Sequence, residues 1–203
     1  MHDLIGLAIL VACIAPLGFA FYWVWVRSER RDKLIQELRA TPGFTPTVQY
    51  VSEQADVFLA LDLGSHRVLI ARPNAVPHII AFANVIAVEI EKDRQSLIKM
   101  HRGNGVSGAA EGASALGPVG LLLSDVTGSK QSKHTLSTLT LKILTSNVDR
   151  PLEEVVFYAG PPVPSSDMAM SACVKRCEEW YARFQTILVG NAEQVGTASE
   201  RID

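Results

Sequence analysis

Two glycine-containing motifs bring this sequence closest to nucleotide chemistry. Gly103–Gly108 (GNGVSG) matches G-x-G-x-x-G, in which glycines let the backbone approach a pyrophosphate. That chemistry also needs a helix that opens at the third glycine of a parallel βαβ unit, and the sequel AAEGASALGP does not favour a helix. Thr127–Lys130 (TGSK) resembles the end of a phosphate-binding loop, but Leu123 stands where the first glycine belongs. We therefore expect no nucleotide site.

Metal-ligating and acid–base side chains are not grouped in the sequence either. The five histidines are His2, His66, His78, His101 and His134. None stands at ligand spacing from a cysteine or carboxylate, so we expect single surface or strand-end histidines. Cys173 and Cys177 are one helical turn apart, which favours packing on a helix face over metal binding, because partner ligands are lacking.

The candidate paired carboxylates are Glu89 and Glu91. Glu89 and Glu91 alternate with apolar residues, which points them to water rather than into the pocket that an acid–base pair needs. The sequence therefore predicts no catalytic residue, no metal site, no cofactor and no small-molecule substrate. We expect the protein not to be an enzyme.

Composition narrows the class of partner. The 203 residues carry 19 Lys+Arg against 21 Asp+Glu, a net charge of −2, so no global field favours nucleic acid. The three cysteines, Cys13, Cys173 and Cys177, form no disulfide framework and fit a reducing compartment. The length allows one core with appendages.

The first segment is predicted to be a transmembrane anchor (residues 1–26). Leu4–Val26 contains no charge, and as a helix it would be about 34 Å long, enough for a hydrocarbon core of about 30 Å. A cleaved signal peptide would carry its positive charges before the apolar run, whereas here they follow it. A core helix of this length without a charge is also unfavourable. We expect a single-pass protein bound to the membrane through Leu4–Val26.

The residues after the anchor set the topology. Arg27, Arg30, Arg31 and Lys33 lie on this side, which the positive-inside rule assigns to the cytoplasm, with the N-terminus outside. The same cations could contact anionic lipid at about 1 kcal/mol each. Residues 27–42 are predicted to form a juxtamembrane helical stalk, which the sequence TPGFTP breaks.

A folded domain is predicted from residue 43 to residue 190, followed by a flexible tail, 191–203. Seven strands are expected, at Val57–Asp62, Arg67–Arg72, His78–Phe82, Val85–Asp93, Ser96–His101, Thr135–Leu144 and Glu153–Tyr158. The prolines after Ala159 should end the sheet, and Asp167 or a neighbouring serine can cap a helix that runs to Gly190. Trp180 and Tyr181 belong to the apolar face of that helix.

Residues 102–133 form a predicted glycine-rich insertion between two strands. Its first part is small and polar enough to be mobile, but its centre is strongly apolar. The large apolar side chains there are Leu116, Val119, Leu121, Leu122 and Leu123. Two interpretations stay open: this tip covers a gap in the domain, or it meets the bilayer surface or a partner. It is too short to span a membrane.

The order of seven antiparallel strands and one amphipathic helix resembles the pleckstrin-homology-like fold, a bent β-sandwich or barrel. That resemblance implies a mainly β domain whose C-terminal helix plugs an open corner, with Trp180 as the structural plug. The chain is also similar to a group of uncharacterised, often prophage-linked bacterial proteins that are membrane-anchored. The similarity lies in Leu59–Ala71, Phe82–Asp93, Gly117–Lys130 and Leu139–Phe157. It implies a bacterial inner-membrane location and no catalytic residues.

Two functions follow as expectations. The first is a module that binds a protein or peptide partner, or itself, through a sheet edge or loops. The second is recognition of a lipid headgroup by the same domain, for which only His66 and Arg67 stand at the first hairpin loop. An enzyme with an unrecognised site is a distant third, and fold analogy alone does not choose among them.

Overall fold

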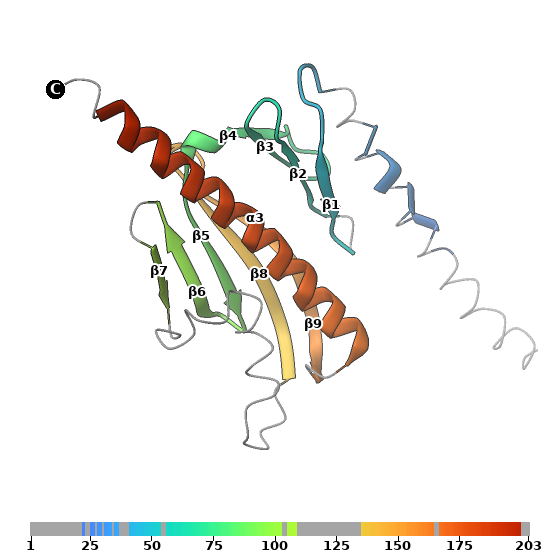
Figure 1. Ribbon diagram of the computed structural model, residues 1–203. Helices are drawn as coiled ribbons and strands as arrows, with labels where there is room; N and C mark the ends of the chain where they lie inside the picture. The colour runs from blue at the N-terminus through green and yellow to red at the C-terminus, as the bar shows by residue number, and fades with distance from the viewer. Residues whose placement is uncertain are drawn as a thin grey trace, which may run out of the picture.

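The computed structural model describes residues 22, 25–26, 28–29, 31–33, 35–36, 41–53, 56–102, 105–108, 135–164 and 167–199, with side chains except at 98, 105–108 and 191–199. This part of the chain contains two antiparallel sheets and a long C-terminal helix (Figure 1). The prediction of a mainly β domain that ends in a helix is confirmed. Among the described residues, no helix has the length and hydropathy of a membrane span.

The first sheet is a meander of four short strands in sequence order: β1 (Val48–Val51), β2 (Phe58–Asp62), β3 (Arg67–Ala71) and β4 (His78–Ala81). The predicted hairpin of β2 and β3 is confirmed, with Asp62 opposite Arg67 at its end. β1 was not predicted. Both faces of the β2–β3 hairpin are buried, because Phe44 and Ile35 pack against the outer face while the inner face joins the main core.

A short 3-10 helix, η1 (Phe82–Asn84), separates β4 from β5 and turns the chain from the first sheet into the second. The predicted strand at His78–Phe82 therefore ends one residue early. The Arg102 guanidinium holds this corner by donating hydrogen bonds to the carbonyl oxygens of Phe82, Ala83 and Val85.

The second sheet has the order β7-β6-β5-β8-β9. Its strands are β5 (Val85–Lys92), β6 (Gln95–His101), β7 (Gly105–Gly108), β8 (Thr135–Thr145) and β9 (Leu152–Pro164). Along β5, Val88 and Ile90 enter the core, whereas Glu89 and Glu91 lie on the other face and pair with lysines of β6 and β8. A register shift between Val85 and Ala87 breaks the predicted alternation, and Ala87 is buried.

Two strands of this sheet differ from the predictions. β9 continues to Pro164 instead of ending near Ala159, because an edge strand tolerates prolines on its unpaired side. Gly105–Gly108, expected to be part of a mobile loop, pairs with β6 as β7.

The helix α3 (Met168–Ser199) crosses one face of the second sheet (Figure 1). The Asp167 carboxylate caps it by accepting hydrogen bonds from the N–H groups of Ala169 (2.9 Å) and Met170 (3.2 Å), as the sequence predicted. The predicted end at Gly190 is wrong, since the helix continues to Ser199. The main core lies where α3 and the inner faces of both sheets meet.

Candidate functional site

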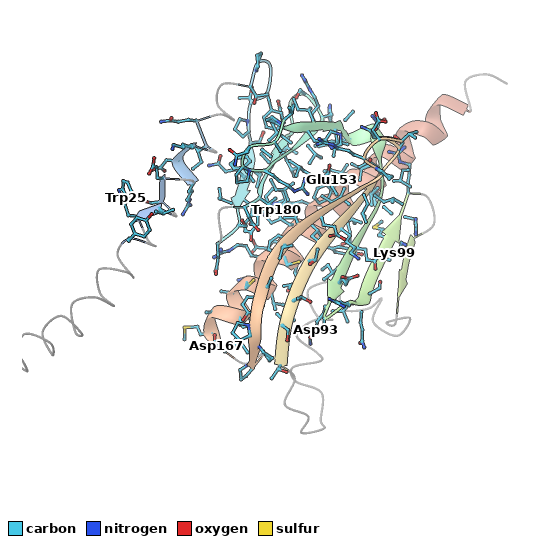
Figure 2. The ribbon with its side chains drawn as sticks, turned by 180° about the vertical axis from the view of Figure 1, so that it is seen from behind. Trp25, Asp93, Lys99, Glu153, Asp167 and Trp180 are labelled. Atoms are coloured by element: carbon cyan, nitrogen blue, oxygen red, sulfur yellow. The ribbon has the colours of Figure 1, made fainter. Side chains whose placement is uncertain are left out.

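A buried carboxylate connects the two sheets at one end of the domain. The Glu153 side chain on β9 is only 4% exposed and accepts hydrogen bonds from Arg72 Nη1 (2.7 Å), just after β3, and from His78 Nδ1 (2.8 Å) on β4. Figure 2 places Glu153 at the start of β9, near the first sheet. Burial alone would raise the pKa of Glu153, but the hydrogen bonds and charge of Arg72 and His78 lower it.

His78 extends this network to the β8–β9 turn. The Asn147 side-chain amide lies 3.2 Å from His78 Nε2, so the imidazole has a carboxylate on Nδ1 and an amide on Nε2. This arrangement matches an imidazole that is protonated at Nδ1. The expectation of an isolated strand-end histidine is therefore wrong for His78. His78 and Glu153 are 75 positions apart in the sequence, so no local pattern could indicate this pairing.

The segments that this network holds together carry exposed aliphatic side chains. Val148 in the β8–β9 turn is 92% exposed, and Val76 before β4 is 79% exposed. Ile79 on β4 and Leu152 at the start of β9 are also exposed. We call these four side chains the aliphatic surface. Each of them is within two residues of a member of the network, so these segments are candidates for a contact site.

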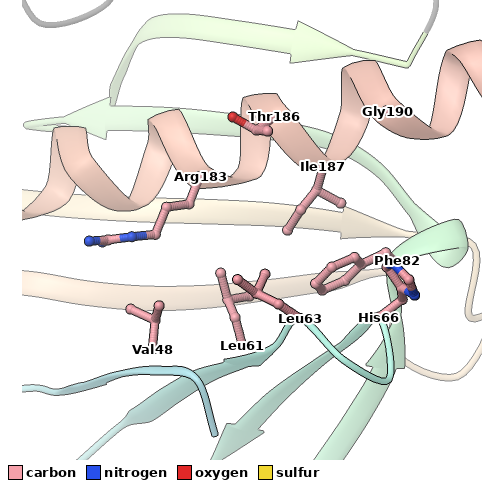
Figure 3. Close-up of a pocket in the computed structure, with 9 residues that line it drawn as sticks. All are labelled: Val48, Leu61, Leu63, His66, Phe82, Arg183, Thr186, Ile187 and Gly190. Carbon is pink, nitrogen blue, oxygen red and sulfur yellow. The ribbon is translucent and has the colours of Figure 1, made fainter.

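A groove of about 380 Å³ lies between the first sheet and the second half of α3 (Figure 3). Its volume falls within the range of small-ligand pockets. The residues that line it are Val48, Leu61, Leu63, His66, Phe82, Arg183, Thr186, Ile187 and Gly190. Phe82, Leu61 and Ile187 are buried, so the floor is apolar, and polar groups are few.

Three buried polar groups of α3 take no part in the groove or the network. Glu178 is 2% exposed, its Oε1 has no hydrogen-bond partner, and burial, with a smaller effect of Glu179, raises its pKa to about 7. Burial also raises the pKa of the Cys173 thiol to about 11 and that of Cys177 well above its ordinary value. These thiols lie in the core, and Cys173 donates to the Phe157 carbonyl oxygen at 3.3 Å.

Several of the residues singled out in the sequence lie outside the part of the chain that the structure describes. Leu116, Val119, Leu121, Leu122 and Leu123 lie outside the described residues, as do Arg27 and Arg30. Arg31 and Lys33 are exposed and helical, and Lys33 pairs with Glu29 at 2.8 Å.

Trp180 is 2% exposed and approaches the ring of Tyr50 edge-on, which places it in the core beside β1. Its role as a plug stays a prediction. Gly108, the third glycine of GNGVSG, lies in an antiparallel strand instead of opening a helix, which removes the structural basis of a dinucleotide site.

One comparison with known proteins gives a match. The family described as "Glycine zipper containing PH domain" matches residues 48–159, which is 112 of the 203 residues. This span runs from β1 into β9 and stops before α3. No curated protein and no solved structure matches the chain.

Proposed function

Because the chain belongs to the family of PH domains that contain a glycine zipper, we propose that it is a non-enzymatic protein that binds a protein or peptide partner, or a second copy of itself. PH-like domains are typically binding modules. The observation that carries the proposal is the exposure of the aliphatic surface beside the buried network of Glu153.

The geometry of β4 supports this mode of binding. β4 ends the first sheet, so within the described residues one edge of its backbone has no neighbouring strand. An extended peptide that pairs with such an edge gains main-chain hydrogen bonds, and apolar side chains beside the edge add specificity. Val76 lies just before β4 and Ile79 lies on it. The contact between Asn147 and His78 holds the next residue, Val148, near β4.

The experiment replaces the two most exposed members of the aliphatic surface. We expect Val76→Ser combined with Val148→Ser to abolish partner capture or self-association of the full chain without lowering the melting temperature. Met168→Ser is the matched control, because Met168 is also highly exposed but lies at the start of α3. Self-association is measured by light scattering and partner capture by co-purification. Equal association of the double variant and the unaltered protein would show that another surface is used.

Leu116, Val119 and Leu121–Leu123 are proposed as a second contact region, either for the partner or for the bilayer surface. The competing interpretation is that they cover a gap in the domain. Replacing Leu121, Leu122 and Leu123 with serine separates the two. Loss of folding supports the cover, and loss of association with unchanged stability supports the contact region.

We further propose that residues 4–26 anchor the protein in a bacterial inner membrane, with the N-terminus outside and the domain in the cytoplasm. The absence of charge in Leu4–Val26 and the cations that follow it support this arrangement. Headgroup recognition by the domain is the second candidate, with only His66 and Arg67 at its first hairpin loop. Arg27, Arg30, Arg31 and Lys33 lie before the domain and are a separate proposed contact with anionic lipid. Flotation of residues 43–203 with anionic liposomes would favour recognition by the domain itself.

A further inference from the structure

The groove between the first sheet and α3 has an apolar floor and an exposed apolar residue at its rim. Leu61 on β2, Phe82 on η1 and Ile187 on α3 form an apolar floor. Leu63, in the hairpin that follows β2, is an exposed apolar residue of the rim. A groove with these walls removes an aliphatic chain from water, at about 0.8 kcal/mol for each buried methylene.

The charge of the groove has one sign. Among the described residues that line it, Arg183 is the only one with a permanent charge, and none carries a carboxylate. Within the described part of the chain, the guanidinium pairs with no carboxylate, and it lies over the face of Trp180, with Cζ 5.1 Å from the ring centroid. A guanidinium without an acidic partner at the side of an apolar groove favours an anion.

The cation and the apolar floor are displaced along the groove. In Figure 3 the guanidinium of Arg183 points toward the end that Val48 lines, whereas Phe82 and His66 lie at the other end, with Leu61 and Ile187 between them. A molecule that lies along the groove therefore meets a positive charge at one end and apolar side chains over the rest of its length.

We propose that this groove binds an aliphatic monocarboxylate of medium chain length, with its carboxylate at Arg183 and its chain along Leu61, Ile187 and Phe82. The volume of 380 Å³ corresponds to roughly a dozen water-sized groups, which suits a chain of about eight to ten carbons with its carboxylate. A phosphorylated headgroup fits less well, since doubly charged phosphates are recognised by clusters of cations and the described lining holds one permanent cation, Arg183. The proposal is independent of partner binding at the aliphatic surface.

Two variants test the two halves of the site. Arg183→Gln removes the charge and leaves the apolar floor. Gly190→Leu adds bulk at the groove. A Cβ at Gly190 meets no atom within 4 Å, and the change replaces a poor helix former with a good one. Val189→Leu is the control, because Val189 is the exposed neighbour on α3 and does not line the groove.

Binding is measured by equilibrium dialysis of octanoate against the full chain in nanodiscs of uncharged lipid, with empty nanodiscs as reference. We expect one saturable octanoate site. Arg183→Gln should weaken octanoate binding about tenfold or more and change octanol binding less than about twofold, because the lost interaction involves the charge. Gly190→Leu should weaken both ligands, and Val189→Leu neither.

Three results would overturn the proposal: no saturable binding above empty nanodiscs, octylammonium binding as tight as octanoate, or an Arg183→Gln variant with unchanged octanoate affinity. Melting temperatures of all variants are recorded. If Gly190→Leu does not fold, the comparison of octanoate with octanol in Arg183→Gln decides the question.

Discussion

Replacing Glu153 with alanine should lower the free energy of unfolding by about 2–4 kcal/mol. The reason is that this carboxylate joins β9 in the second sheet to Arg72 and His78 in the first. Removing it leaves the half-buried imidazole of His78 without its partner on Nδ1 and the Arg72 guanidinium without its counter-charge.

The magnitude follows from the exposure of each partner. The His78 side chain is 13% exposed, so an unsatisfied donor there costs about 1–3 kcal/mol. The Arg72 side chain is 36% exposed and regains water, so the loss of its ion pair adds only about 1 kcal/mol. Complete loss of a buried pair would cost about 3–5 kcal/mol, which sets the upper limit.

Urea unfolding of the fragment 43–203 measures the change. Glu154→Ala is the control, because Glu154 is the next residue on β9 but its side chain is half-exposed. Its Oε1 lies a long 3.6 Å from Lys142 Nζ. A double-mutant cycle of Glu153→Ala with Arg72→Met isolates the share of the ion pair, which should be about 1 kcal/mol. If Glu153→Ala and Glu154→Ala lower the free energy of unfolding by the same amount, the network does not hold the sheets together.

The pH dependence of the free energy of unfolding tests the same interaction in a second way. The pKa of Glu153 is lower in the folded protein, which therefore binds fewer protons than the unfolded chain. The stabilisation is complete above the unfolded pKa of about 4.3 and is lost as the pH falls through the folded pKa. The difference between the unaltered protein and Glu153→Gln should therefore shrink below about pH 4. A difference that stays constant down to pH 3 would contradict the reasoning.

Three further predictions concern other parts of the chain. Trp180→Ala should cost about 3–5 kcal/mol in urea unfolding because Trp180 is almost fully buried, and an unchanged melting temperature would show that it is peripheral. Glu178, whose pKa is raised to about 7, makes the folded state bind more protons than the unfolded chain between about pH 4.3 and 7, so stability falls as the pH rises through this window. Glu178→Gln should therefore stabilise the domain by up to about 3 kcal/mol at pH 8 and much less at pH 4, and equal gains at both pH values would contradict this origin. A reporter fused after Asp203 should be active only if it is of a kind that works in the cytoplasm, and periplasmic phosphatase activity would overturn the proposed topology.

The parts of the fold that the sequence predicted correctly have strong local signals. The β2–β3 hairpin has apolar runs on both sides of a turn with Gly64, and α3 has a cap at Asp167 and apolar residues at helical spacing. The errors lie where tertiary context overrides those signals. Pro161 and Pro162 continue β9 because it is the edge strand of its sheet, and Gly190 lies inside α3 although glycine commonly ends a helix.

The sites depended on contacts between residues far apart in the sequence. Glu153 meets Arg72 and His78 only after the two sheets have formed, and Arg183 reaches the groove only because α3 lies beside β1 and β2. The exposure of Val148 is likewise a property of the turn and not of its residue type. Periodicity places such residues on a face but does not say which other face they meet.

The connection between β7 and β8 has a consequence for how this domain can diversify. It comprises the 26 residues between Gly108 and Thr135, and the two strands that it joins are separated in the sheet by β6 and β5. The entropy cost of closing a connection between two fixed strands grows only with the logarithm of its length, so each doubling of length costs about 0.6 kcal/mol. Relatives of this chain should therefore differ in length here far more than in the turns at Leu63–His66 or Asp93–Arg94, where one added residue would shift the register of the flanking strands.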